Sequence, residues 1–174
     1  VNRGDRWKDV CRFAAAYRDV ISRSFPDLVE EARGIAEGSC LSVEDIMVIN
    51  CRYEMSKVPQ IPECTTGAVL PEASQSGCTY SCKNWDFSSG VMDHLIILHI
   101  TTEDGTRILG LTEAGQMIRD GFNSHGLSIG TNNLQSVYDH GGWGIPVTFL
   151  RRKMLMCRRF EDALFLADRA ERTI

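Results

Sequence analysis

Cys64 stands in a setting that suits a nucleophile. It follows Ile61-Pro62-Glu63 and precedes Thr65-Thr66, where a proline-bearing loop meets what we expect to be a strand. A thiol nucleophile needs a base, and no histidine lies within motif distance of Cys64. The α-amino group of an N-terminal cysteine can be that base, because it titrates at about pH 7.7–8.0. The residues alone leave two alternatives: a nucleophile freed by cleavage of the Glu63-Cys64 bond, and a small buried apolar thiol, which is the commoner role of a free cysteine.

Asp86 and Asn132 are the next candidates for chemistry, since each follows a predicted strand. Asp86 lies within Asn84-Trp85-Asp86-Phe87, and its carboxylate suits a bond to a new chain amine or to a substrate amide N–H. Asn132, the first of Asn132-Asn133, can donate an amide hydrogen bond to an oxyanion. Both residue types are also ordinary turn formers, so each position keeps that alternative.

Motifs for metals and nucleotides are weak. Cys78 and Cys82 invite a zinc interpretation, but structural zinc sites need four ligands, commonly in two closely spaced pairs, and the chain has no second pair. The glycine-rich stretches lack both the Walker lysine arrangement and the dinucleotide G-x-G-x-x-G spacing. We therefore predict no metal site and no bound cofactor.

The composition of the chain limits the classes of partner and the compartments that we expect. The net charge of -4 at pH 7 gives no basic excess that would favour nucleic acid. No apolar run reaches the roughly 18 residues of a membrane span, and no signal-peptide pattern opens the chain. Seven cysteines in unlike contexts argue against a disulfide framework and for a reducing, intracellular compartment, cytoplasmic or peroxisomal. The chain begins at Val1 and stops at Ile174 inside a helical pattern, so we expect it to be part of a longer protein.

Apolar residues at three- and four-residue spacing predict three helices before Cys64. The first covers residues 7–24, and Pro26 ends it and opens the second. Gly38 is the expected terminator of the second helix. The third begins at Ser42, whose hydroxyl caps it while Asp45 reaches back, and it extends to about residue 54.

The rest of the chain is predicted to be mainly sheet. Prolines make residues 57–63 an expected extended loop. Alternating patterns then predict strands at residues 65–70, 79–85, 95–101, 107–112, 116–122 and 127–131. A hairpin turn is expected at Glu103-Asp104-Gly105. Pro146 opens a helix to about Arg158, and a last helix starts at Phe160. Strand meanders with separate helices indicate the α+β class.

Six blocks of sequence, in order, carry a family resemblance. They are residues 33–38 (RGIAEG), 50–54 (NCRYE), 64–66 (CTT), 84–87 (NWDF), 111–115 (LTEAG) and 121–126 (GFNSHG). Together they resemble the acyl-coenzyme A:6-aminopenicillanic acid acyltransferase family. This family belongs to the N-terminal nucleophile (Ntn) hydrolases and is similar to the choloylglycine (bile-salt) and penicillin V hydrolases.

The resemblance implies an αββα Ntn fold, of which this chain is the first portion, and a precursor that cuts itself. Residues 1–63 would be a helical α segment that stays bound to a β segment starting at residue 64. Carried over by motif, Cys64 is the nucleophile that attacks the Glu63 carbonyl, Asp86 positions it, and Asn132 supports the oxyanion. The residues expected around the substrate are Thr65, Thr66, Lys83 and Asn84, with Lys83 standing where the bile-salt hydrolases carry an arginine.

The expected function is that of a cysteine amidohydrolase or acyltransferase. It would act on small amide or acyl-thioester substrates through an acyl-cysteine intermediate, with acyl-coenzyme A as one acyl donor to consider. The expected partners are this small-molecule substrate and the two segments of the same precursor, with no nucleic acid and no membrane. The alternative is an unprocessed, inactive member that keeps the fold for binding.

Overall fold

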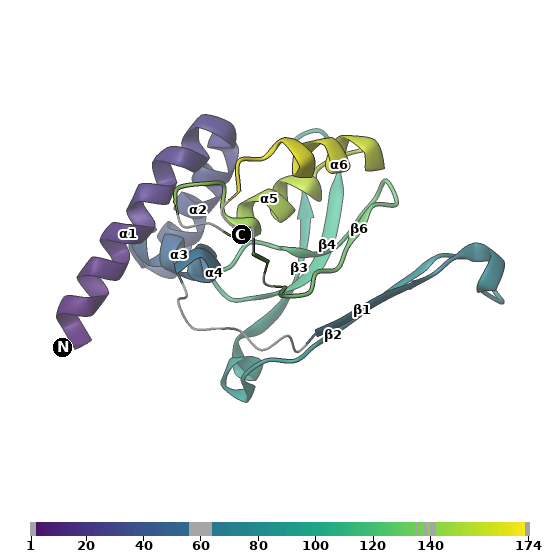
Figure 1. The fold of residues 1–174 in the computed structure, drawn as a ribbon, viewed down its shortest axis with the longest axis horizontal. Helices are drawn as coiled ribbons and strands as arrows, with labels where there is room; N and C mark the ends of the chain where they lie inside the picture. Colours follow the sequence, from purple (N-terminus) through teal and green to yellow (C-terminus); the bar gives the residue numbers. More distant parts are fainter. Residues whose placement is uncertain (1–2, 56–63, 135, 138, 140–141, 173–174) are drawn as a thin grey trace.

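The structure is a computed structural model that describes the chain apart from residues 1–2, 56–63, 135, 138, 140–141 and 173–174. Helices come first, two antiparallel sheets follow, and two further helices pack on the larger sheet (Figure 1). The predicted α+β class is therefore confirmed. The expected loop at residues 57–63, including Glu63, lies outside the described residues.

The helices before Cys64 form where the apolar spacing predicts them. They are α1 (Arg3–Ser24), α2 (Pro26–Ser39), α3 (Val43–Asn50) and the short α4 (Arg52–Met55). On α1 the buried residues Ala14, Tyr17 and Ile21 recur at three- and four-residue spacing. At the start of α3, the Asp45 backbone N–H donates to the Ser42 hydroxyl at 3.1 Å, and the Ser42 N–H donates to the Asp45 carboxylate. The predicted capping box is thus confirmed.

Two helix ends differ from the prediction. Gly38 does not terminate α2, because Cys40 takes the left-handed conformation with φ of 56° and lets the Leu41 N–H reach the Ala36 carbonyl at 3.0 Å. The third helix stops at Asn50 instead of continuing to residue 54. There the Asn50 amide donates to the Ile46 carbonyl within the helix at 2.9 Å and to the Gly115 carbonyl at 3.0 Å, so a tertiary contact lies at this boundary.

The strands form two antiparallel sheets. One pairs β1 (Cys64–Val69) with β2 (Tyr80–Trp85), and the other has the order β3 (Leu95–Thr101), β4 (Arg107–Glu113), β5 (Asp120–Asn123), β6 (Ser128–Ile129). Most predicted strands are confirmed within a few residues. Residues 116–119 are not part of β5, because the side chains of Gln116 and Arg119 are buried in contacts with α3 and Glu113.

A glycine pair brings β4 and β5 close together. Gly110 faces Gly121 across the strands. A Cβ atom at Gly110 would lie 2.3 Å from the Asp120 carbonyl oxygen, and one at Gly121 would lie 2.3 Å from the Leu109 carbonyl oxygen. Only glycine fits such an approach. The pair therefore sets the backbone that carries Asp120.

Two apolar cores hold these elements together. The helices α5 (Val147–Met154) and α6 (Phe160–Arg169) cover one face of the larger sheet, around Ile108 and Leu155 (Figure 1). The other core joins α1, α2 and α3 to α5 through Phe149. The predicted helix after Pro146 is confirmed but ends at Met154, earlier than expected.

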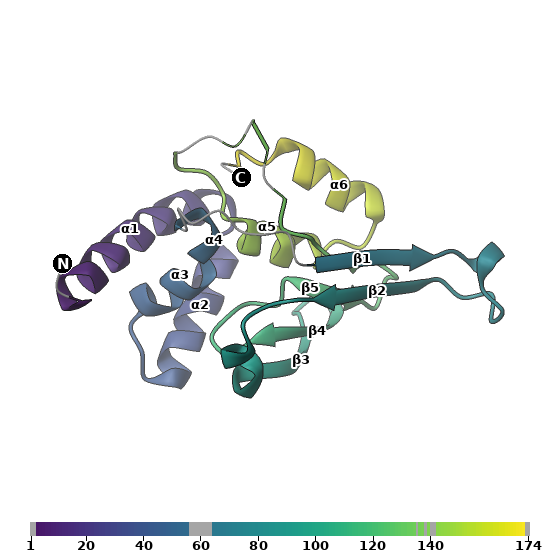
Figure 2. The same ribbon diagram turned by 60° about the horizontal axis from the view of Figure 1, so that its bottom comes forward.

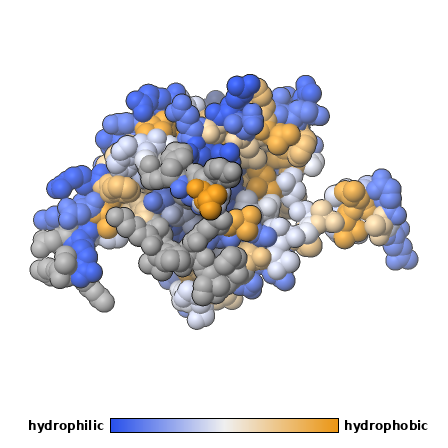
Figure 3. Space-filling model, in the orientation of Figure 1, coloured by the Kyte–Doolittle hydropathy of each residue, from blue (hydrophilic) through white to orange (hydrophobic). Residues whose placement is uncertain are grey.

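The β1–β2 hairpin extends away from the body of the molecule (Figure 2). Its far end exposes the apolar residues Val69, Leu70 and Tyr80 (Figure 3). All seven cysteines carry free thiols. Across the described residues, the helices are too short or too polar to cross a membrane.

Candidate active site

Strand pairing places Cys64 beside the residues at the end of β2. Cys64 is the first residue of β1 and pairs with Trp85, and Thr66 pairs with Lys83. Because cross-strand partners and alternate residues share a face of a sheet, Cys64, Lys83 and Trp85 point to the same side. Thr65 and Asn84 pair with each other on the opposite, exposed side. These two side chains therefore point away from the face that carries Cys64.

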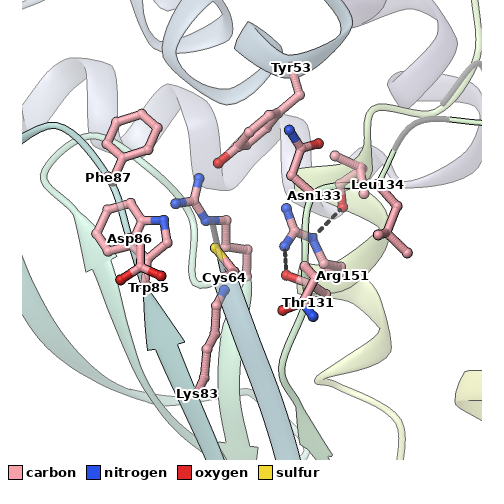
Figure 4. Close-up of a pocket in the computed structure, with 13 residues that line it drawn as sticks. Tyr53, Cys64, Lys83, Trp85, Asp86, Phe87, Thr131, Asn133, Leu134 and Arg151 are labelled. Carbon is pink, nitrogen blue, oxygen red and sulfur yellow. Dashed lines mark hydrogen bonds between the residues drawn. The ribbon is translucent and has the colours of Figure 1, made fainter. Parts of the chain in front are cut away.

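A cavity of about 220 Å³ opens on the side to which Cys64 points. Figure 4 shows the Cys64 sulfur between the end of β2 and the segment that starts at Thr131. The cavity is lined by Tyr53, Cys64, Lys83, Trp85, Asp86, Phe87, Arg119, Thr131, Asn132, Asn133, Leu134, Val147 and Arg151. It thus brings together the candidates Cys64, Asp86 and Asn132, and Lys83 with them. Thr66 lies on the same face of β1 but does not line the cavity.

Asp120, at the start of β5, joins several elements beneath this cavity. Its carboxylate accepts hydrogen bonds from the Lys83 ammonium at 2.8 Å and from the Thr131 N–H and hydroxyl at 3.1 and 2.8 Å. A nitrogen of Arg151 lies 3.7 Å from the same carboxylate. Burial raises the pKa of Asp120, but the charges of Arg151 and Lys83 outweigh it and hold that pKa below its ordinary value.

Arg151 reaches the cavity from the buried side of α5. Its guanidinium donates to the Thr131 hydroxyl and to the Val147 carbonyl, and Figure 4 shows it beside Thr131. Burial lowers the pKa of Arg151, and the nearby Arg119 charge acts in the same direction, whereas Asp120 opposes both. Thr131 is thus held between Asp120 and Arg151, which fixes the backbone next to Asn132.

Glu113 bridges two further guanidinium groups. It accepts from both terminal nitrogens of Arg52, at 2.5 and 2.6 Å, and from Arg119 at 3.2 Å. The Arg119 side chain is only 4% exposed and also donates to Gln116 at 2.7 Å. Three cations (Lys83, Arg119 and Arg151) therefore line the cavity, against the single carboxylate of Asp86. Each of these cations is paired with a largely buried carboxylate, Asp120 or Glu113, which holds it in place beside the cavity. Fixed cationic donors suit a reaction in which negative charge develops.

Glu54 on α4 holds the wall of the cavity from the other side. One carboxylate oxygen accepts the Val147 N–H at 2.7 Å, at the start of α5, and the other is buried without a partner among the described residues. Burial raises the pKa of Glu54 above its ordinary value. The ionised carboxylate is therefore costly at this position, while its hydrogen bond to Val147 is useful.

Replacement of Glu54 by glutamine is expected to change stability by no more than about 1 kcal/mol, because the amide oxygen keeps the bond to Val147 without the buried charge. Glu54→Ala removes this acceptor from the first turn of α5 and is expected to cost about 2 kcal/mol. Urea unfolding of both variants at pH 7 measures the difference. Equal losses in the two variants would show that the charge itself is needed.

Several cavity residues were not among the sequence candidates. Tyr53 comes from α4, Arg119 from the segment before β5, and Arg151 from α5. Arg119 follows Met117-Ile118, and a charged residue in such an apolar run was the available signal. Arg151 carries no comparable signal, because an arginine in a helix is usually solvated. In the part of the chain that the structure describes, no three His, Cys, Asp or Glu side chains cluster as a metal site would require.

Comparison with known proteins identifies the family of this chain. The model of the acyl-coenzyme A:6-aminopenicillanic acid acyl-transferase family matches residues 73–173. The chain belongs to this family. The matched region of the chain contains Lys83, Asp86, Arg119, Asp120 and Arg151. Cys64 lies before this region.

A curated relative points to the same acyl-transferase family. It is the 40 kDa form of acyl-coenzyme A:6-aminopenicillanic-acid-acyltransferase from Emericella nidulans, and it is 33% identical over 118 residues. The alignment covers 66% of this chain and 32% of the relative, so the chain spans about a third of the relative's length.

Proposed function

We propose that the protein is a cysteine acyltransferase or amidohydrolase whose nucleophile is Cys64. The observation that carries this proposal is the single cavity in which Cys64 meets Asp86, Asn132 and three cations, in a chain of the acyl-transferase family. A soft nucleophile beside cationic donors that are held in place suits attack on an amide or thioester carbonyl. The aromatic rings of Tyr53, Trp85 and Phe87 suit an apolar acyl group.

Maturation would come before turnover. The Cys64 sulfur attacks the carbonyl carbon of Glu63, the peptide C–N bond breaks, and its nitrogen takes a proton to become the α-amine of Cys64. Water then hydrolyses the thioester, which restores the thiol and leaves a carboxylate on Glu63. The product is an N-terminal cysteine with its own base, within the Ntn-type αββα fold that we propose for the whole protein.

In turnover the freed α-amine would accept the thiol proton as the sulfur attacks the substrate carbonyl. Asn132 and the cations of the cavity would stabilise the oxyanion, and Asp86 would orient the amine of Cys64. Collapse of the tetrahedral intermediate expels the amine or thiol of the substrate and leaves an acyl-cysteine. Water or an acceptor amine then takes the acyl group and restores the thiol.

Contacts across the proposed cleavage point support a bound α segment. Asn50 donates to Gly115 and accepts from the Met117 N–H at 3.0 Å. Arg52 pairs with Glu113, and Glu31 on α2 pairs with Arg152 on α5 at 2.9 Å. With the shared core around Phe149, these bonds would hold residues 1–63 to the rest after cleavage. The two segments would then form a heterodimer.

The direct test is to trap the acyl-cysteine. Purified full-length protein is incubated with a panel of acyl-coenzyme A thioesters and acyl amides, and intact mass is recorded. The expected result is two separate chains, produced by cleavage of the precursor between Glu63 and Cys64. The mass of the acyl group is expected on the chain that begins with Cys64. A single uncleaved chain that neither gains an acyl group nor turns over any donor would favour the alternative of an inactive binding protein.

Asp86→Asn is expected to keep the fold and to lower turnover about 100-fold, because the change removes charge and conserves shape. Asp86 is exposed at the cavity, so little packing is lost. Steady-state kinetics of the variant, with its melting temperature as the control for folding, measure the effect. A wild-type kcat would remove Asp86 from the mechanism.

A further inference from the structure

The residues on either side of Asp86 form an aromatic stack. The rings of Trp85 and Phe87 are stacked, with centroids 5.2 Å apart and an interplanar angle of 16°. They flank Asp86 in the sequence, so whatever fixes the two rings also fixes the backbone of Asp86. The position of Asp86 therefore depends on what the rings contact.

Both rings lie against guanidinium groups. The Arg119 guanidinium carbon is 5.4 Å from the centroid of Trp85, and that of Arg52 is 5.0 Å from the centroid of Phe87. The ring of Tyr53 contacts both guanidinium groups. Its centroid is 5.0 Å from the guanidinium carbon of Arg52 and 5.4 Å from that of Arg119. Cation–π contacts of this kind are directional, and they strengthen when they are removed from water.

Two neighbouring guanidinium groups repel each other unless an anion lies between them. Glu113 is that anion, since its carboxylate accepts hydrogen bonds from both terminal nitrogens of Arg52 and from one nitrogen of Arg119. Its side chain is 9% exposed, so the bridge is shielded from solvent. The hydrogen bonds to Glu113 make the pKa of Arg52 higher than usual in spite of the burial that opposes them. The pair of cations is thus a fixed platform for the rings.

We propose that Glu113 and Arg52 are positioning residues for the active site: their ion bridge, extended by Arg119, sets the Trp85-Phe87 stack and thereby places Asp86 beside Cys64. Arg52 belongs to α4, on the α segment, whereas the other members come from the β segment. The α segment therefore completes the site as well as covering it. This inference rests on the proposed function, because it assigns a partner to Asp86 in that chemistry.

The test uses the full-length protein with Glu113→Gln and Arg52→Lys. Glutamine removes the charge, and lysine keeps a charge but loses the bidentate and stacked geometry. The expected result is a kcat, per alkylatable Cys64, that falls by about 10- to 100-fold in both variants with KM changed less than threefold. Arg52→Lys keeps a cation at a partly exposed position, so it serves where Glu113→Gln folds poorly.

Glu31→Gln is the matched control. It breaks another ion pair between the two segments, with the buried Arg152, away from the cavity. Its kcat per active site is expected to equal that of the wild type, even if the protein melts earlier. A kcat per active site that is unchanged in both Glu113→Gln and Arg52→Lys would overturn the inference, because a merely structural bridge would lower only the amount of folded protein.

A second readout separates this inference from the proposed function. The rate of Cys64 alkylation by iodoacetamide, followed by peptide mass spectrometry across pH, needs no substrate. The pH profile is expected to shift in Arg52→Lys as it does in Asp86→Asn, and to stay unchanged in Glu31→Gln. Shifted profiles in a protein that turns over no acyl substrate would retain the bridge and reject the enzyme function. Unshifted profiles in a protein with normal turnover would retain the enzyme function and reject the positioning role of the bridge.

Discussion

Cys64→Ala is expected to leave the full-length protein as one uncleaved chain and to lower its turnover of acyl substrates by about 10⁴- to 10⁶-fold. The alanine has no atom to attack the Glu63 carbonyl, so neither the new amine nor the acyl intermediate can form. Losses of this size follow removal of a nucleophile when only binding and oxyanion contacts remain. Intact mass and a substrate assay on the same preparation measure both effects. Cys64→Ser keeps a weaker nucleophile and is expected to mature slowly.

Cys82→Ala is the matched control for the loss of a thiol. Cys82 lies on the same hairpin, is exposed, and points its sulfur to the Gly67 carbonyl at 3.3 Å, outside the cavity. This variant is expected to be cleaved and to work like the wild type. Full amidase activity in Cys64→Ala would show that another group is the nucleophile, and the assignment of Cys64 would then be wrong.

Local signals were enough for most of the elements. The spacing of Ala14, Tyr17 and Ile21 predicted a one-sided helix, and the Ser42-Asp45 pair predicted where the third helix begins. Asp104-Gly105 predicted a hairpin, and Gly105 adopts a φ of 83° there. Each of these features is decided by residues within a few positions of one another.

The chemistry of the cavity wall depends on contacts between residues far apart in the chain. Arg52 and Glu113 are 61 positions apart, and no pattern within α4 or β4 predicts that they meet. The contact at the end of the third helix is also long-range, because Asn50 bonds to Gly115 across 65 positions. The motif candidates Cys64, Lys83, Asp86 and Asn132 could be named from the sequence, but Arg119 and Arg151 were not among the candidates.

Asp120→Asn is expected to destabilise the protein by about 3–5 kcal/mol, the largest stability loss we expect from a single change of charge in this fold. The amide conserves shape and keeps an acceptor for Thr131, but it leaves Lys83 and Arg151 without their buried counter-charge. Urea unfolding at pH 7 measures the loss. Asp9→Asn is the control, because its pair with Arg12 is highly exposed and exposed pairs contribute at most about 1 kcal/mol.

The stabilising effect of Asp120 must also depend on pH in a definite direction. Its pKa is lower in the folded protein than its ordinary value, so the unfolded chain takes up the proton first as the pH falls. The difference in unfolding free energy between wild type and Asp120→Asn should therefore be constant at neutral pH. It should shrink below about pH 4, where an unfolded aspartate becomes protonated. A difference that stays constant down to pH 2.5, or grows there, would show that the Lys83 and Arg151 charges do not act through this carboxylate.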